Sequence, residues 1–320
     1  MTRRATVAPV VRLTEDGPRP DQDLVAVESP LRLDVGRAGD DRRWPLGLLM
    51  RTPGDDADLV HGLLFTEGVI TRATDVERLT LVPGPARGDA PGPNAAGAAD
   101  SARPNAAAVP DSAGRNAADA ADRADDGESA GDGDAALAIV AASIDLADLL
   151  QTRVLVTTSA CGLCGRLADV RIDRLGTGVR ERPSWPAALV ASLPDLLAAG
   201  QAVFAETGGL HAAGLFDAEG RRLLVREDVG RHNAVDKVLG AALREGRLPA
   251  TDGLLVVSGR AAYEIVQKAA VAGVAGLVAV GAPSSLAVEA ARAAGLTLVG
   301  FARGGRFNVY AGHGRIGDVR

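Results

Sequence analysis

The carboxyl-terminal third of the sequence alternates short strands with helices, and this pattern restricts the fold more than any other feature. Short apolar runs rich in Val and Leu predict strands over 253–257, 276–280 and 296–301. Between them, apolar residues at helical spacing predict helices over 262–272 and 284–294. Strands joined by a helix pair in parallel, with a right-handed crossover. The sequence therefore predicts an α/β fold built on a parallel sheet.

In a parallel sheet of this kind, ligands bind beyond the carboxyl ends of the strands. The candidate residues at these ends are Ser258, Arg260, Ser284, Arg303, Gly304, Gly305 and Arg306. Hydroxyl and free N–H groups at a helix start can bind phosphate, the arginines add positive charge, and the glycines permit close approach. Neither a GxGxxG nor a GxxxxGK[ST] fingerprint is present, so a nucleotide-like ligand is expected without NAD or P-loop chemistry.

Composition divides the chain into four parts. Residues 84–135 are almost entirely Ala, Gly, Asp, Pro, Asn, Ser and Arg, and too few are apolar to form a core, which predicts a disordered insertion. Before it we expect a flexible tail (1–24) and a small α+β unit (25–83), and after it an α/β domain (136–320). The insertion holds ten acidic residues against four arginines, which accounts for the whole net charge of −6. The remainder is formally neutral and gives no charge argument for binding nucleic acid or a membrane.

Three further features predict a cytoplasmic protein. The chain has only two cysteines, both in one motif, so no disulfide framework is available and a reducing compartment is expected. Residues 5–16 contain Pro, Thr, Arg, Glu and Asp rather than the apolar stretch of an export signal. The longest apolar run, 271–283, is too short to span a bilayer.

The cysteine motif is the sharpest candidate for chemistry. Cys161 and Cys164 stand three positions apart, each followed by glycine, after an apolar strand. Glycine lets the backbone approach another molecule, and neighbouring N–H groups with Arg166 favour the reactive thiolate. A persulfide relay needs such a nucleophile on an accessible loop.

Three other interpretations of this motif remain. Cys-x-x-Cys is half of a tetrahedral zinc site, for which His211 and His232 are the plausible partners. A thioredoxin-like redox pair is a second alternative, although that motif opens a helix and residues 166–174 alternate like a strand. Two inert buried cysteines are a third, against which the flanking glycines argue.

Two further segments carry polar residues in suggestive patterns. His211 lies in a glycine-rich strand, where a histidine of the core is the ordinary interpretation. Asp228, His232 and Asp236 are four positions apart and share one helical face. That face is expected to be solvated and ion-paired, yet the same groups near a glycine would also serve anion recognition or proton transfer.

Together these segments resemble the FdhD family of formate dehydrogenase accessory sulfurtransferases. The resemblance covers most of the chain outside the tail and the insertion. It is carried by MRTPGDD (50–56), SACGLCG (159–165), TGGLHAA (207–213), REDVGRHNAVDK (226–237), SGRAAYEIVQKA (258–269), APSSLA (282–287) and FARGGRFNVY (301–310).

The resemblance implies a three-layer α/β/α sandwich similar to that of cytidine deaminases, in a homodimer. It implies that sulfur passes from a cysteine desulfurase to bis-molybdopterin guanine dinucleotide, which formate dehydrogenase requires. Cys161 would carry the persulfide and Cys164 would assist or relay. The guanine dinucleotide would contact Phe301, Ala302, Arg303, Gly304, Gly305 and Arg306, with Ser258, Arg260, Ser284, His211 and His232 also in the cofactor site.

The deaminase likeness can be tested within the sequence. Zinc deaminases need His-x-Glu and Pro-Cys-x-x-Cys. None of the four histidines is followed two residues later by Glu, and Ala160 precedes Cys161, so no permanent metal is expected. The rival functions are a non-catalytic chaperone whose cysteines ligate or shield molybdenum, and a redox or zinc-binding structural module.

Overall fold

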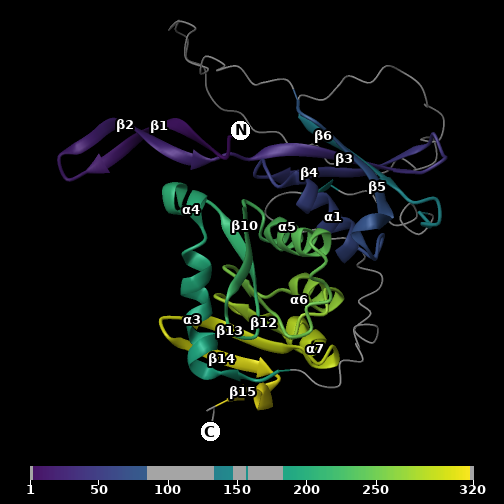
Figure 1. The fold of residues 1–320 in the computed structure, drawn as a ribbon. Helices are drawn as coiled ribbons and strands as arrows, with labels where there is room; N and C mark the ends of the chain where they lie inside the picture. Colours follow the sequence, from purple (N-terminus) through teal and green to yellow (C-terminus); the bar gives the residue numbers. More distant parts are fainter. Residues whose placement is uncertain (1–2, 85–132, 147–155, 158–182, 318–320) are drawn as a thin grey trace, which may run out of the picture.

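The computed structural model describes residues 3–84, 133–146, 156–157 and 183–317. Figure 1 shows a projecting hairpin, a sheet from the first half of the chain, and a larger layered body from the second half. Cys161, Cys164 and most of the predicted insertion lie outside the described residues.

The larger body is built on a six-stranded sheet in the order β10-β9-β11-β12-β13-β14. Its strands are β9 (His211–Phe216), β10 (Arg222–Asp228), β11 (Leu254–Val257), β12 (Gly276–Ala279), β13 (Thr297–Arg303) and β14 (Arg306–Ala311). The three central strands β11, β12 and β13 are parallel, as the sequence predicts, and antiparallel strands flank them on both sides.

Helices cover both faces of this sheet, which confirms the predicted α/β/α layering. α3 (Ala187–Ala198) packs on one face, and α5 (Arg231–Arg244), α6 (Tyr263–Val271) and α7 (Ser285–Ala293) pack on the other. Leu254 and Val256 of β11 join the core under α3, while Leu255 and Val257 join the core under α5 and α6. Since both faces are buried, the strand is apolar throughout rather than alternating.

The remaining elements of this half are short. They are α4 (Ala202–Thr207), β8 (Trp185–Pro186), the 3₁₀ turn His313–Arg315 and β15 (Ile316–Gly317), which pairs with β8.

A second sheet, in the order β5-β6-β3-β4-β7, corrects the predicted domain boundary. Its strands are β3 (Ser29–Arg37), β4 (Arg43–Arg51), β5 (Val76–Val82), β6 (Asp134–Val140) and β7 (Val156–Thr157), with the 3₁₀ turn Ala73–Asp75 before β5. The domain expected at 136–320 therefore begins too early, and the predicted insertion 84–135 includes the first two residues of β6. β6 belongs here because it pairs in parallel with β3, a long-range contact that its local alternation does not reveal.

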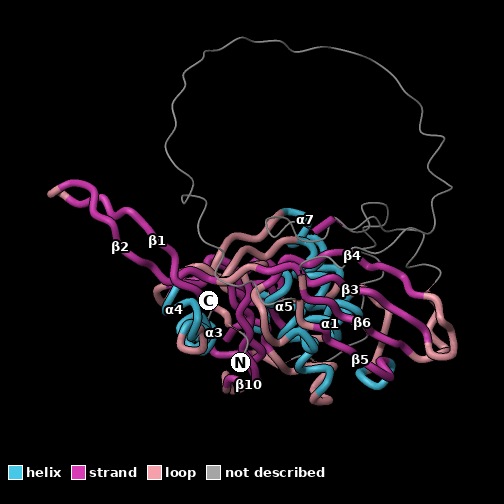
Figure 2. Tube along the Cα trace, turned by 90° about the horizontal axis from the view of Figure 1, so that it is seen from above, coloured by secondary structure: helices cyan, strands magenta, loops and turns pink. Residues whose placement is uncertain are grey.

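The predicted flexible tail also requires correction, because residues 5–26 form a hairpin. β1 (Ala5–Thr14) pairs along its whole length with β2 (Gly17–Ala26), and the hairpin extends away from the body (Figures 1 and 2). Pro9, Pro18 and Pro20 conceal the strands in the sequence. These prolines stand in every second residue pair of the hairpin. A hairpin of two strands leaves one edge of each strand without a neighbouring strand. At such an edge the missing N–H of proline costs no hydrogen bond.

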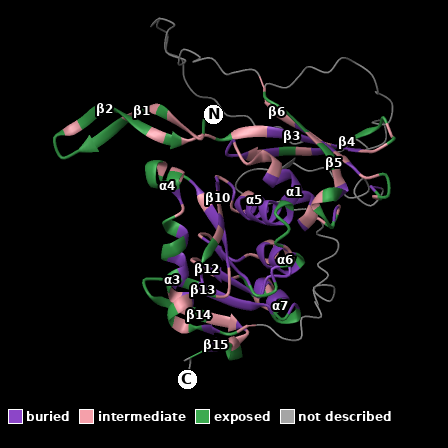
Figure 3. Cartoon of the chain, viewed as in Figure 1, coloured by how far each residue is buried: buried purple, intermediate pink, exposed green. Residues whose placement is uncertain are grey.

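The two sheets are joined through a close contact between α1 (Asp56–Thr66) and α5. A Cβ on Gly62 would lie 1.8 Å from the carbonyl oxygen of Asp236, and one on Gly240 would lie 1.8 Å from that of Asp58. Both helices are largely buried (Figure 3). Each helix therefore needs a glycine where the other's backbone crosses it.

Gly62→Ala and Gly240→Ala should each lower the free energy of unfolding by about 1–3 kcal/mol, because the methyl group forces the helices apart. In an exposed helix the same substitution of glycine by alanine would raise the free energy of unfolding by about 1 kcal/mol. The direction of the change therefore shows whether the two helices are in close contact at the glycine. Urea unfolding measures the effect. Gly314→Ala is the control, since a Cβ there meets nothing within 4 Å; an equal response of all three variants would contradict the close contact.

Candidate functional site

The site is framed by a buried ion pair at the start of α5. Lys237 Nζ lies 2.7 Å from Asp228 Oδ2, and both side chains are fully buried. Lys237 also donates to the carbonyl oxygen of Thr52 (2.8 Å), and the Thr52 N–H donates to Asp228 (3.1 Å). Asn233 donates to Asp228 (3.0 Å) and to the carbonyl oxygen of Met50 (2.8 Å). The turn after β4 is thus tied to the first turns of α5.

The face formed by Asp228, His232 and Asp236 is buried rather than solvated, which corrects the sequence interpretation. Asp236 accepts from Lys268 Nζ (2.8 Å) and from Thr66 Oγ1 (2.9 Å), so it joins α5 to α6 and α1. The solvated interpretation failed because the helix has a second packed side, covered by α1, that its apolar periodicity does not show.

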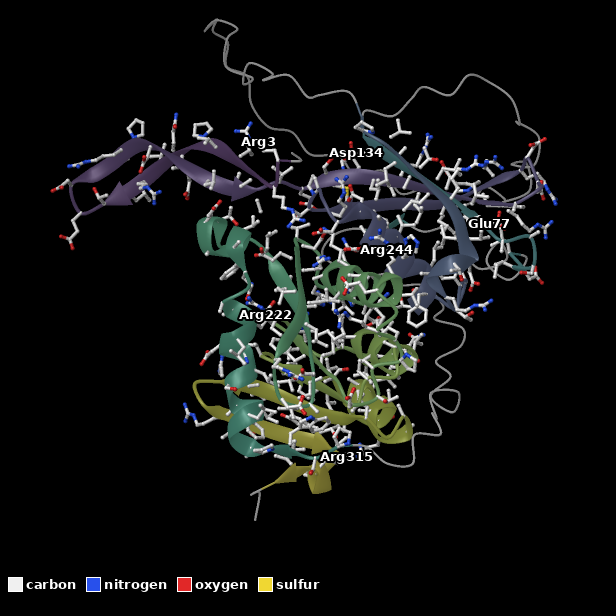
Figure 4. All side chains as sticks on the ribbon, viewed as in Figure 1. Arg3, Glu77, Asp134, Arg222, Arg244 and Arg315 are labelled. Carbon is white, nitrogen blue, oxygen red and sulfur yellow. The ribbon has the colours of Figure 1, made fainter. Side chains whose placement is uncertain are left out.

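Two neighbours of this ion pair position other elements. Arg226 donates to Asp58 of α1 (2.9 Å). Arg244, which is labelled in Figure 4 and lies at the far end of α5, pairs with the same carboxylate. Glu227 accepts from the N–H groups of Val203 (3.0 Å) and Phe204 (2.7 Å) and so holds the start of α4. Most of the segment 226–237 is therefore internal support.

A cavity of 560 Å³ opens at the carboxyl ends of the parallel strands, where the sequence places a ligand. One wall comes from α3 and α4, and the other from the strand ends. Its lining residues are Pro194, Asp195, Leu197, Ala198, Gln201, Phe204, Gly208, Gly209, Leu210, His211, Val229, Ser258, Val280, Ala302, Arg303 and Gly304. His211, Ser258, Ala302, Arg303 and Gly304 are thus brought together, as members of the predicted cofactor site.

Other predicted residues lie beside the cavity or serve the fold. Ser284 caps its own helix, since its Oγ accepts from the Ala287 N–H (3.2 Å). Gly304 and Gly305 form a two-residue hairpin turn between Arg303 and Arg306, with φ of 57° and 73°. Such a turn needs positive φ at both positions, so these glycines are explained by the turn rather than by close approach of a ligand.

Phe301 has an unusual backbone for an aromatic residue. Its φ is 53°, its N–H donates to the carbonyl oxygen of Gly281 (3.0 Å), and 40% of its surface is exposed. Left-handed φ at a non-glycine residue costs about 1–3 kcal/mol and is concentrated at functional sites. Phe301 therefore presents an aromatic ring beside the strand ends at an energetic cost to the fold.

Two side chains at the start of α5 hold buried atoms that lack partners in the part of the chain that the structure describes. These atoms are Nε of Arg231 and Nε2 of His232. Burial, with the nearby charge of Arg231, lowers the pKa of His232 to about 3 and also lowers the pKa of His211. Both rings are therefore neutral at pH 7.

Sequence reasoning missed three contributors to this region. Arg231 was passed over as one cation among several in a polar segment. Gln201 and Phe204 line the cavity from α4, a helix of six residues that is too short to show a helical period. The local signal for this helix in the sequence is the pair of glycines that bound it, Gly200 and Gly208.

His232 should make stability depend on pH. Between the ordinary pKa of 6.5 and about 3, the unfolded chain binds a proton that the folded chain does not, so stability falls as pH decreases. This residue should contribute a slope of about 1.4 kcal/mol per pH unit. Urea unfolding at pH 7 and pH 5 should show a shallower dependence for His232→Gln than for the unsubstituted chain; identical slopes would refute the buried neutral ring.

Comparisons with known proteins find relatives along nearly the whole chain. A model of the FdhD/NarQ family matches residues 27–317. A sulfur carrier protein FdhD of Nocardia farcinica is 44% identical over 97% of this chain and 94% of its own, and one of Streptomyces avermitilis is 40% identical over 96% and 94%.

A solved structure gives the same fold. The crystal structure of a candidate formate dehydrogenase accessory protein from Desulfotalea psychrophila aligns with a TM-score of 0.63 and 22% identity, over 98% of this chain and 100% of that one. No helix among the described residues has the length and apolarity to cross a bilayer.

Proposed function

The chain belongs to the FdhD/NarQ family, and from this membership we propose that it is a sulfurtransferase that carries persulfide sulfur to a molybdenum cofactor. Its relatives are named sulfur carrier proteins, which supports the carrier role. The substrate is bis-molybdopterin guanine dinucleotide, and the enzyme that uses the product is a formate dehydrogenase.

The sulfur is accepted on Cys161. Its thiolate attacks the outer sulfur of a persulfide on a cysteine desulfurase; a new S–S bond forms, the donor's S–S bond breaks, and the donor cysteine leaves as a thiolate. Cys164, three positions away, assists or relays the sulfur. The reaction belongs in the cytoplasm, because both cysteines must stay reduced.

The cavity at the carboxyl edge of the sheet is the observation that carries the cofactor assignment. Its volume of 560 Å³ suits one nucleotide-sized part of the substrate. Arg303 lines the cavity, while Arg260 follows the end of β11 and Arg306 begins β14. The exposed ring of Phe301 offers a stacking surface for guanine. We assign one guanosine diphosphate portion to this cavity.

Replacing Cys161 by Ala should abolish a sulfur adduct. Intact-protein mass is measured after incubation with a cysteine desulfurase and cysteine, for the unsubstituted chain, Cys161→Ala and Cys164→Ala. The adduct should disappear in Cys161→Ala and persist in Cys164→Ala, because only the first thiolate attacks the donor. If no sulfur adduct forms on the unsubstituted chain, the proposed sulfur-carrier function is rejected. The non-catalytic cofactor chaperone is then the better explanation.

We propose that the protein acts as a homodimer joined through the β1–β2 hairpin. Opposite residues of an antiparallel pair share a face, and one face of this hairpin carries no charge. That face consists of Val7, Pro9, Val11, Leu13, Pro18, Pro20, Gln22 and Leu24. Val11 and Leu13 are 64% and 83% exposed. An isolated two-stranded hairpin is marginally stable, so a second copy that covers this face would stabilise it.

Val11→Asp should shift the dimer towards monomer, because it places a charge on the uncharged face. Thr14→Asp adds the same charge to the opposite face of the same strand and should leave the dimer intact. Sedimentation velocity over a concentration series measures the association. A monomer at all concentrations for the unsubstituted chain, or equal weakening by both substitutions, would rule out this interface.

A further inference from the structure

β10 directs neighbouring side chains to opposite faces of the larger sheet, because successive residues of a strand point in opposite directions. On one face, Arg226 and Asp228 pair with residues of α1 and α5. Glu227 lies between these two residues and points to the other face, where its register partner, Ala212, belongs to the core under α3. The carboxylate of Glu227 therefore reaches the side of the sheet that carries α3 and α4.

This carboxylate is buried and depends on α4 for its hydrogen bonds. Glu227 is 5% exposed. Its Oε2 accepts from the N–H of Val203 (3.0 Å), and its Oε1 accepts from the N–H of Phe204 (2.7 Å). Within the described part of the chain, no Lys or Arg pairs with it. Because a buried charge costs free energy unless it is hydrogen-bonded, the carboxylate and α4 hold each other in place.

α4 has few other contacts that fix its position. None of its six residues is buried, and a helix of this length is not stable by itself. It ends at Gly208, and a β-carbon built on the next residue, Gly209, would lie 3.3 Å from the β-carbon of Ala26 in β2. α4 thus lies between the end of α3 and the β1–β2 hairpin (Figure 1). A segment with so little burial opens at a lower cost than the core around it.

The same segment forms part of the cavity wall. Gln201, which precedes α4, and Phe204, within it, both line the cavity. A ligand that fills the cavity therefore contacts α4 as well as the strand ends. Movement of α4 away from the sheet would remove the contacts of these two residues with the ligand and would open that side of the cavity to water.

We propose that α4 is a movable wall of the cavity and that Glu227 is the positioning residue that latches it. While both hydrogen bonds are formed, Gln201 and Phe204 enclose the ligand. When they break, water hydrates the carboxylate, α4 withdraws and the ligand leaves. The identity of the ligand rests on the function proposed above, whereas the latch rests on contacts within this chain. Release of α4 thereby sets how fast the cavity exchanges its ligand.

Glu227→Gln tests the latch. Glutamine keeps one acceptor oxygen but places an NH₂ group against the second N–H, so one hydrogen bond and the charge are lost. Amide hydrogen exchange, resolved to single residues, should become about tenfold faster at Val203 and Phe204, because Glu227 is their acceptor. Exchange in β11 and α5 should stay unchanged. Glu206→Gln is the matched control, since Glu206 is an exposed residue of the same helix.

The rate of ligand release connects the latch to the cavity. The fluorescent nucleotide mant-GDP is bound to each protein, and its release is followed by stopped flow after addition of excess GDP. Release from Glu227→Gln should be about tenfold faster than from the unsubstituted chain, because one charge-assisted hydrogen bond no longer holds the wall. Glu206→Gln should release the nucleotide at the unsubstituted rate. Equal release rates from all three proteins would overturn the movable wall.

The exchange measurement decides the latch without any ligand. Unchanged exchange at Val203 and Phe204 in Glu227→Gln would overturn it. A rise that extends to β11 and α5 would overturn it as well, because it would mark a general loss of the fold. If the unsubstituted chain does not bind mant-GDP, the proposed nucleotide ligand is rejected, and hydrogen exchange still shows whether Glu227 latches α4.

Discussion

The buried ion pair of Asp228 and Lys237 is the interaction on which the rest of the structure depends. It closes around the backbone of Thr52, so the turn after β4, the end of β10 and the start of α5 are fixed by one set of hydrogen bonds. Removal of one partner would leave an uncompensated charge in the interior, at a cost of about 3–5 kcal/mol. The pair thereby sets where the edge of the larger sheet lies relative to the amino-terminal sheet.

The same segment supplies both the support and the site. Between Arg226 and Lys237, the carboxylates and Lys237 are used in internal bonds, and Glu227 holds α4 over the cavity. Arg231 and His232 are the members that keep buried atoms without partners in the described chain. A polar group that is buried and unpaired costs stability, so these two atoms are exceptions in a segment whose other charged groups are satisfied.

Local pattern was enough to predict the parallel strands and their helices, but not the contacts between distant segments. β11, β12 and β13 are apolar on both faces and each precedes a turn, so their positions follow from the sequence within about two residues. The pairing of β6 with β3 crosses the whole insertion and has no local signal. The strands β1 and β2 were hidden by prolines at free edges, and α4 is held by Glu227 rather than by its own period. Among the residues that line the cavity, Ser258 and Arg303 were predicted because they lie at strand ends, and His211 was predicted from the family resemblance. Arg231 becomes distinctive only when its neighbours are seen to be paired.

Close backbone contact explains why a chain with so few aromatic residues can hold a rigid site. With Gly62 and Gly240 at the crossing of α1 and α5, the two helices meet backbone to backbone, and no flexible side chain separates them. Phe, Tyr and Trp make up only 3% of the sequence, so the core relies on this close approach of small residues. α5 is thereby fixed along its length against α1, and its first residue, Arg231, is fixed with it.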